Sequence, residues 1–186
     1  HKDLDEYLLT IPNLLHESVP EGDSEDHNKF IREHGKIKKY KFTPLEHDEI
    51  AEQLDKSMDF ELSSQLSGSR FVVLKNKIAR LHRALGQFML DLQINKHGYT
   101  ETYVPLLVKS NALYGTGQFP KFRDDQFGTL VDDYWLIPTA EVPVTNFVNN
   151  KIIEQNDLPL KFACLSSCFR REAGTYGKDT KGMMRL

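Results

Sequence analysis

The chain has 186 residues, of which 39% are hydrophobic and 27% are charged, and its formal net charge at neutral pH is −3. This composition is ordinary for a soluble globular protein, and the length suggests one domain with an appendage. No apolar run approaches the roughly 18 residues of a membrane span and no signal peptide opens the chain, so we expect a cytoplasmic protein. The slightly acidic balance argues against a general nucleic-acid binder, so any RNA contact must be local.

Residues 1–26 are predicted to be the end of a helix followed by a linker. Leu4, Leu8 and Ile11 follow helical spacing, and Pro12 ends the pattern. The residues that follow are rich in proline, glycine and acidic side chains and have no hydrophobic period. Such a composition is typical of a linker.

Two helices and a short strand are predicted between residues 43 and 97. Thr43 is a plausible N-cap of the first helix, with Pro44 in its first turn. Residues 67–74 indicate a short strand. Residues 75–97 predict the longest helix, because apolar residues recur along it at steps of three or four and form one stripe. The stripe consists of Leu74, Ile78, Leu81, Leu85, Phe88 and Leu92. It is expected to face a core, with the basic side chains on the solvated faces.

A strand and a glycine-rich loop are predicted next. Gly98 ends the long helix, and residues 99–108 alternate as a strand in which Pro105 indicates an edge or a strand end. Ser110 is predicted to cap a short helix that leads into the glycine-rich loop at residues 115–120.

A hairpin is predicted at residues 126–137, with its turn at two aspartates. Directly after it, Thr139 is favoured as the N-cap of a helix and Glu141 as its first-turn acid. A helix start can also line a binding pocket, so both interpretations of these residues stay open.

Two cysteines, Cys164 and Cys168, lie in the stretch of residues 158–169, which is rich in apolar and aromatic residues and predicts a strand. In a strand they would share one face but lie too far apart to favour a disulfide. Because no cluster of Cys and His with metal-ligand spacing lies nearby, buried free thiols are favoured over zinc ligands.

The last eighteen residues carry a local charge of +3. The predicted strand before them would hold Arg170 on rigid backbone, where its guanidinium can bind two phosphate or carboxylate oxygens. Basic side chains beside glycines suit a polyphosphate site, because glycine lets the backbone approach closely. On composition alone, a solvated basic hairpin is the alternative.

The sequence FRREAGTYGKDTKGMMR at residues 169–185 resembles motif 2 of class II aminoacyl-tRNA synthetases, in the form found in seryl-tRNA synthetases. Thr139-Ala140-Glu141 is similar to the threonine-x-glutamate signature of that family. Residues 75–108 resemble motif 1, the family's dimer interface, and residues 115–120 match a further segment of these enzymes.

The resemblance implies an α+β fold, the class II synthetase catalytic domain, with a mainly antiparallel sheet flanked by helices. Residues 1–26 would be the end of a coiled-coil arm and its linker, and residues 27–186 the N-terminal part of the catalytic domain. Motif 2 would extend over about residues 158–186. Since the sequence starts without methionine and stops inside this motif, we expect a truncated chain that is inactive alone and poorly soluble or associated.

The function implied is that of a serine–tRNA ligase, which uses ATP and Mg²⁺ to convert L-serine to seryl-adenylate and then transfers serine to tRNA(Ser). The complete protein is expected to be a homodimer through motif 1. Because the reaction brings two anions together, charge neutralisation and in-line placement are the main tasks of the site, without a protein nucleophile.

By the same resemblance, Arg170 is the catalytic residue and bridges the serine carboxylate and the α-phosphate of ATP. The expected serine pocket comprises Thr139, Ala140, Glu141 and Arg170, and the expected ATP site comprises Arg170, Arg171, Glu172 and Arg185. Glu172 would contact the adenine amino group, and Arg185 would reach the outer phosphates. Lys178 and Lys181 would meet the tRNA acceptor end. No metal ligand is expected from the protein, since Mg²⁺ arrives bound to ATP.

Two alternatives remain. One is a synthetase-like ligase that loads an amino acid onto a carrier protein; the arm-like helix end at residues 4–11 argues against it, and Thr139-Ala140-Glu141 offers no cysteine for a zinc-dependent relative. The other is a non-catalytic module on a class II scaffold, which degraded signatures would favour. Arg170, Glu172 and Arg185 are all present.

Overall fold

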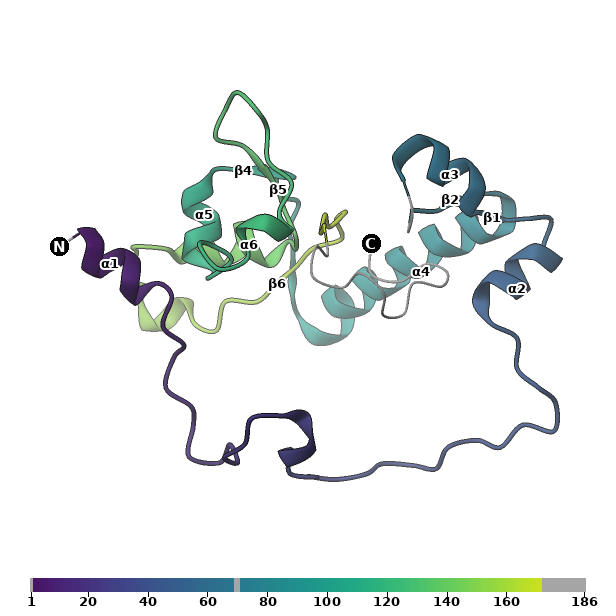
Figure 1. The fold of residues 1–186 in the computed structure, drawn as a ribbon, viewed down its shortest axis with the longest axis horizontal. Coiled ribbons are helices and arrows are strands. Elements are labelled where there is room, and N and C mark those ends of the chain that lie inside the picture. Colours follow the sequence, from purple (N-terminus) through teal and green to yellow (C-terminus); the bar gives the residue numbers. More distant parts are fainter. Residues whose placement is uncertain (1, 69–70, 172–186) are drawn as a thin grey trace. The chain divides into compact units, whose positions relative to one another are not determined.

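The computed structural model describes residues 2–68 and 71–171, and the chain divides into two compact units, His1–Leu45 and Glu46–Leu186 (Figure 1). The first unit contains helix α1 (Lys2–Leu8) and the 3-10 helix η1 (Glu25–His27). Extended chain joins and follows these helices, and every side chain described in this unit is exposed. The structure confirms the predicted helix before Pro12.

The second unit begins with three helices and one pair of short strands. Its first elements are α2 (His47–Gln53), β1 (Met58–Asp59), α3 (Phe60–Ser67), β2 (Val73–Leu74) and α4 (Asn76–His97). The predicted start of the first helix near Thr43 is wrong. Helix α2 instead starts after Glu46, which forms a capping box with Glu49: the Glu46 backbone N–H donates to the Glu49 carboxylate at 2.8 Å.

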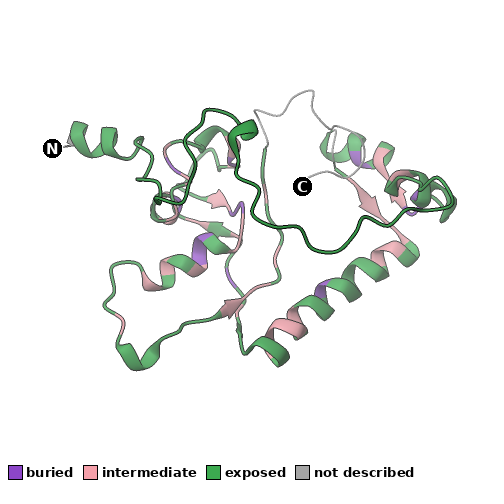
Figure 2. Ribbon diagram, turned by 90° about the horizontal axis from the view of Figure 1, so that it is seen from below, coloured by how far each residue is buried: buried purple, intermediate pink, exposed green. Residues whose placement is uncertain are grey.

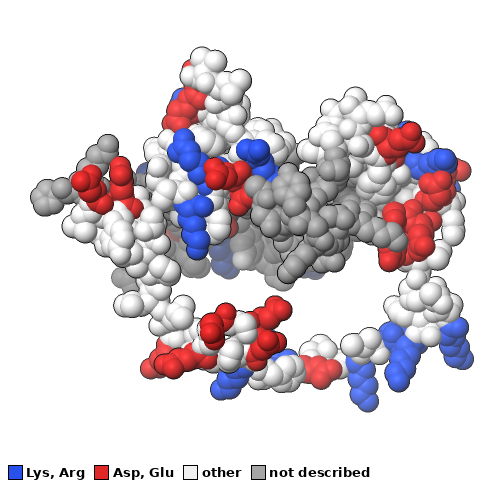
Figure 3. Space-filling model, viewed as in Figure 1, with Lys and Arg blue, Asp and Glu red and all other residues white. Residues whose placement is uncertain are grey.

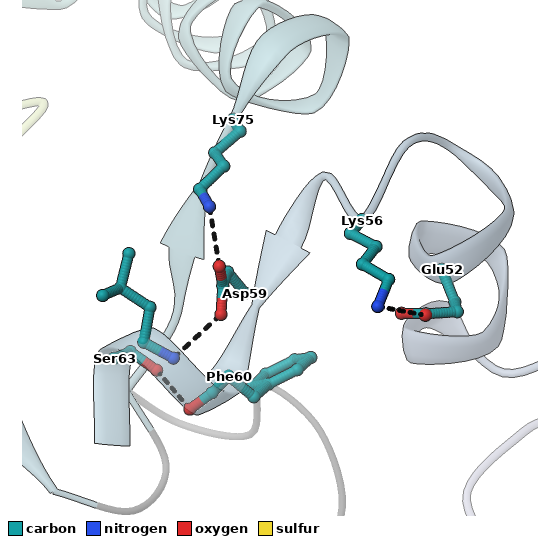
Figure 4. A network of polar contacts seen from close by, with 7 residues as sticks. Glu52, Lys56, Asp59, Phe60, Ser63 and Lys75 are labelled. Carbon is teal, nitrogen blue, oxygen red and sulfur yellow. Dashed lines mark hydrogen bonds and ion pairs between the residues drawn. The ribbon is translucent and has the colours of Figure 1, made fainter. Parts of the chain in front are cut away.

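Asp59 holds three of these elements together (Figure 4). Its carboxylate accepts a hydrogen bond of 2.8 Å from the backbone N–H of Leu62 and so caps α3. It also accepts one of 2.6 Å from the ammonium of Lys75, at the start of α4. The Lys75 hydrogen bond, followed by the Leu62 N–H, lowers the pKa of this carboxyl below its ordinary value of 3.8. The charged form of Asp59 therefore stabilises the folded state.

Replacing Asp59 with asparagine should lower the Tm near neutral pH, and the difference from the wild type should shrink as the pH falls below about 3.8. The folded carboxyl binds its proton less tightly than the unfolded one, so its contribution is complete above the ordinary pKa and is lost as the pH falls through the folded pKa. Thermal unfolding followed by circular dichroism at several pH values measures this. Asp91→Asn, at an exposed position on α4, is the control; an equal, pH-independent loss in both variants would contradict the prediction.

Helix α4 matches the predicted range, and its end is set by Gly98, whose φ of 67° lies in the left-handed region that glycine favours. The prediction that its apolar stripe faces a core is wrong within the described structure. Leu81, Leu85 and Phe88 are 52%, 48% and 61% exposed, and most of α4 is coloured as exposed in Figure 2. The buried position on this helix is Gly86, where an added Cβ would lie 3.3 Å from Leu165.

The rest of the second unit consists of short elements joined by long loops. They are β3 (Thr100–Glu101), β4 (Leu107–Val108), α5 (Ser110–Gly115), η2 (Arg123–Asp125), β5 (Trp135–Leu136), α6 (Glu141–Thr145), η3 (Asn146–Val148), η4 (Gln155–Asp157) and β6 (Phe162–Ala163). Strand β4 pairs antiparallel with β5, as β1 does with β2. Strand β3 pairs parallel with β6. The mixture of helices with mostly antiparallel pairs confirms the predicted α+β class.

The core of the second unit lies where α5, α6 and the loop after α5 meet. Leu113, Phe119 and Val142 are almost completely inaccessible and contact one another. The ring of Trp135 packs edge-to-face on Phe119, with the centroids 4.7 Å apart. The guanidinium of Arg123 lies 4.9 Å from the ring centroid of Phe119 and 4.8 Å from that of Trp135, which adds cation–π contacts at the surface of the core.

Candidate active site

Arg170 is placed by hydrogen bonds that tie residues 169–171 to two distant parts of the chain. The Phe169 N–H donates to the carbonyl oxygen of Ile137 at 2.9 Å, and the Arg170 Nε donates to the carbonyl oxygen of Pro138 at 3.2 Å. The Arg171 N–H donates to the carbonyl oxygen of Asp125 at 3.0 Å. The strand predicted over residues 158–169 is present only as β6, Phe162–Ala163, so these hydrogen bonds rather than a continuous strand hold Arg170 in place.

Thr139 stands at the start of α6, beside this arginine. Its hydroxyl accepts a hydrogen bond of 3.3 Å from the Glu141 N–H, and its carbonyl oxygen accepts one of 3.2 Å from Val142. The N-cap residue of α6 is Ala140, so the prediction of Thr139 as the N-cap is wrong by one position. Glu141 is in the first turn, as predicted, and its side chain is exposed.

Arg170 and Thr139 line the same pocket, which has a volume of about 230 Å³. The other lining residues are Gln118, Phe122, Asp125, Gln126 and Pro138. The volume lies below the roughly 300–1,000 Å³ of pockets for drug-sized ligands, so a small polar molecule suits it better. Among the described lining residues, one permanent cation is combined with hydroxyl, amide and carboxyl groups, which matches a small zwitterion.

The loop after α5 supplies Gln118 to this pocket. Gly117 has a φ of 70°, which turns the chain back so that the N–H groups of Gln118 and Phe119 both donate to the Leu113 carbonyl oxygen, at 2.9 and 3.2 Å. The glycine-rich loop was identified in the sequence, but its pocket role was not. The burial of Phe119 fixes the loop against the core.

The start of α5 is held by the predicted hairpin. Asp133 accepts hydrogen bonds from the Ser110 N–H at 3.1 Å, from its hydroxyl at 2.8 Å and from the Trp135 indole N–H at 2.9 Å. The Trp135 bond, followed by those from Ser110, lowers the pKa of the Asp133 carboxyl. The prediction that Ser110 caps this helix is wrong. Ser110 is the first residue of the helix, and Asp133 provides the acceptor for its N–H.

The other predicted site residues either do not line this pocket or lie outside the described residues. Arg171 does not line the pocket, and its guanidinium lies 6.0 Å from the ring centroid of Phe127. Ala140 and Glu141 follow Thr139 in the chain but are not among the lining residues. Four further residues of the prediction, Glu172, Lys178, Lys181 and Arg185, lie outside the described residues. Gln118, Phe122 and Gln126 were not predicted, since only tertiary packing brings them to Arg170.

Both cysteines are free thiols, as predicted. The prediction that both are buried is wrong for Cys168, which is exposed, while partial burial raises the pKa of the Cys164 thiol. Across residues 2–68 and 71–171, no group of three or more His, Cys, Asp or Glu side chains is arranged to hold a metal ion.

The chain is similar to known proteins along its whole length. Residues 124–186 match the family described as the tRNA synthetase class II core domain (G, H, P, S and T). The chain is 53% identical to a serine–tRNA ligase of Wigglesworthia glossinidia brevipalpis, in an alignment that covers 100% of the chain and 44% of that protein. It is also 53% identical to a serine–tRNA ligase of Bartonella tribocorum, covering 98% of the chain and 42% of that protein. The chain thus spans less than half the length of these relatives.

Two solved structures share its fold. A seryl-tRNA synthetase from Pyrococcus horikoshii complexed with ATP has a TM-score of 0.90 at 37% identity, covering 100% of this chain and 45% of that one. A cytoplasmic serine–tRNA ligase from Naegleria fowleri in complex with AMP has a TM-score of 0.85 at 31% identity, covering 100% and 44%. These similarities confirm the predicted class II fold.

Proposed function

We propose that this chain, which is homologous over its whole length to part of the class II seryl-tRNA synthetases, belongs to a protein that activates L-serine with ATP and transfers it to tRNA(Ser). The observation that carries the proposal is the shared pocket of Arg170 and Thr139. The two residues come from separate motifs, 31 positions apart in the sequence.

In the first step, a carboxylate oxygen of serine attacks the α-phosphorus of ATP, the bond to the β-phosphate breaks, and pyrophosphate leaves. In the second, a ribose hydroxyl of the 3′-terminal adenosine of tRNA attacks the seryl carbonyl, and AMP leaves. Arg170 neutralises the carboxylate and the α-phosphate and holds them in line. Mg²⁺ enters as the ATP complex and shares the phosphate charge.

The serine pocket consists of Thr139, Ala140, Glu141 and Arg170 in this proposal. An acceptor for the ammonium group and a polar group for the hydroxyl discriminate against other small amino acids, because a buried partner left unpaired costs free energy. The ATP site consists of Arg170, Arg171, Glu172 and Arg185. The position of Arg170 supports its part in both sites.

The complete protein acts as a cytoplasmic homodimer in this proposal, with motif 1 at residues 75–108 as the interface. The exposed apolar side chains of Leu81, Leu85 and Phe88 on α4 support this role, because they give an isolated chain a face that association would cover. None of the helices in the described residues has the length and apolar character of a membrane span. Residues 1–26 are the end of a tRNA-binding arm and its linker, and residues 27–186 begin the catalytic domain.

Serine-dependent exchange between ATP and labelled pyrophosphate tests this function directly. We expect exchange with L-serine, and little with threonine, alanine or glycine, in the complete gene product, and much less in the chain of residues 1–186 alone. The chain of residues 1–186 corresponds to 44% of the length of its relative, so more than half of that protein's sequence has no counterpart in it. Absence of exchange with all four amino acids in the complete product would contradict the assignment, and a normal rate in the short chain would contradict the need for further sequence.

A further inference from the structure

The first unit contains a strongly basic segment, which lies between two acidic stretches of the sequence. Residues 29–41, here called the basic segment, contain six basic side chains and one acid and so carry a formal charge of +5. Residues 1–28 have one basic and eight acidic side chains, and residues 42–68 have one basic and seven acidic. The charge is therefore concentrated locally in a chain whose total is −3.

The basic segment presents its charge to solvent. No helix or strand is formed within it, and all its residues are exposed. The basic residues are Lys29, Arg32, Lys36, Lys38, Lys39 and Lys41. The ion pairs of the described residues, such as that between Lys75 and Asp59, involve none of these six. Figure 3 shows blue side chains projecting from the extended stretch that precedes α2.

Aromatic side chains accompany the lysines. Tyr40 and Phe42 are 53% and 67% exposed, and their ring centroids lie 5.2 Å apart. The Lys38 ammonium lies 5.5 Å from the centroid of Tyr40. Exposed aromatic rings interleaved with lysines are common in proteins that bind single-stranded nucleic acid. The ammonium groups pair with phosphates, and unstacked bases stack on the rings.

We propose that the basic segment is a contact site for the phosphate backbone of RNA, and that tRNA is its partner. The basic segment has the opposite charge to RNA, whereas the acidic stretches that precede and follow it in the sequence would repel RNA. The proposal rests on the proposed function only for the identity of the RNA as tRNA. Backbone contacts of this kind fix a bound RNA without reading its sequence.

The test compares the complete protein with a variant in which Lys36, Lys38, Lys39 and Lys41 are all replaced by glutamine. Its affinity for the tRNA(Ser) transcript is measured by fluorescence anisotropy between about 50 and about 200 mM salt. We expect the affinity to fall roughly tenfold or more, and the slope of log affinity against log salt to fall by about 0.7 to 0.9 for each lysine that contacts a phosphate. A non-cognate tRNA should lose affinity equally.

A matched control carries the same charge change outside motifs 1 and 2: Lys56, Lys109, Lys121 and Lys151, all exposed, are replaced by glutamine. An unchanged affinity in the first variant, or an equal loss in the control, would overturn the proposal. Lysine-dependent binding to anionic phospholipid vesicles with unchanged tRNA affinity would identify a membrane surface as the partner instead, and would also overturn it.

Serine-dependent pyrophosphate exchange separates this proposal from the proposed function, because that reaction needs no tRNA. The variant should retain the wild-type exchange rate while its aminoacylation rate falls at limiting tRNA. A wild-type protein that binds tRNA through these lysines but shows no exchange would contradict the proposed function and leave the RNA contact supported.

Discussion

Replacing Arg170 with alanine should lower kcat/KM for serine-dependent pyrophosphate exchange by about 10²- to 10³-fold in the complete protein, by analogy with the loss of one oxyanion-hole donor. The guanidinium lies in the pocket with Thr139, tethered to the Pro138 carbonyl oxygen at 3.2 Å. It is the pocket's permanent cation among the described lining residues, and the reaction needs a cation between two anions. Steady-state exchange at varied serine and ATP concentrations measures the loss.

Arg170→Lys separates charge from geometry. Lysine keeps the positive charge but cannot form the planar two-point contact of a guanidinium, so we expect activity well below the wild type. Both substitutions should raise KM, because the guanidinium contacts the bound substrates in the ground state, and lower kcat, because this contact strengthens in the transition state.

Arg32→Ala provides the control, since it removes the same side chain from an exposed position outside the pocket and outside motif 1. Circular dichroism and the Tm confirm that each variant is folded. An Arg170→Ala protein that is folded and retains more than about a tenth of the wild-type activity would contradict the assigned role, because one transition-state contact is worth more than that.

Local sequence signals predicted the elements that depend on local physics. The apolar spacing of residues 75–97 predicted α4 almost to the residue, and Gly98 ends it in the left-handed conformation that glycine favours. Pro12 likewise follows the end of α1. These features need no partner elsewhere in the chain, so the sequence alone was sufficient.

Long-range contacts account for what the sequence did not predict. Helix α5 is capped by Asp133, 23 residues further along, rather than by its own Ser110. Helix α3 was missed because its range has few apolar repeats, and its cap, Asp59, is shared with Lys75, 16 residues away. The parallel pairing of β3 with β6 joins segments about 60 residues apart, which no local pattern encodes.

The candidate site shows the same division. Arg170 and Thr139 were identified from motifs, and the structure places both at one pocket. Gln118 and Gln126 line that pocket through a positive-φ turn at Gly117 and through burial, and neither has a sequence signature of ligand binding. The motif residues of the pocket could be predicted from a resemblance, whereas its other lining residues could be identified only from the folded structure.

Replacing Leu113 with alanine should destabilise the second unit by about 2 to 5 kcal/mol, the usual cost of such a truncation in a packed core. Leu113 is completely inaccessible and contacts Phe119 and Val142. Its carbonyl oxygen accepts the bonds from Gln118 and Phe119, so the pocket wall is built directly on this residue. Urea unfolding followed by tryptophan fluorescence reports the change, since Trp135 packs on the same core.

Leu130→Ala is the matched control, because it makes the same chemical change at a side chain that is fully exposed. Its effect should stay within about 0.5 kcal/mol, as expected for a surface position. Equal losses of unfolding free energy in the two variants would contradict the prediction, because the packing around Leu113 would then contribute no more to stability than an exposed side chain does. A loss confined to Leu113→Ala would show that the cluster stabilises the second unit, and with it the loop that carries Gln118 to the Arg170 pocket.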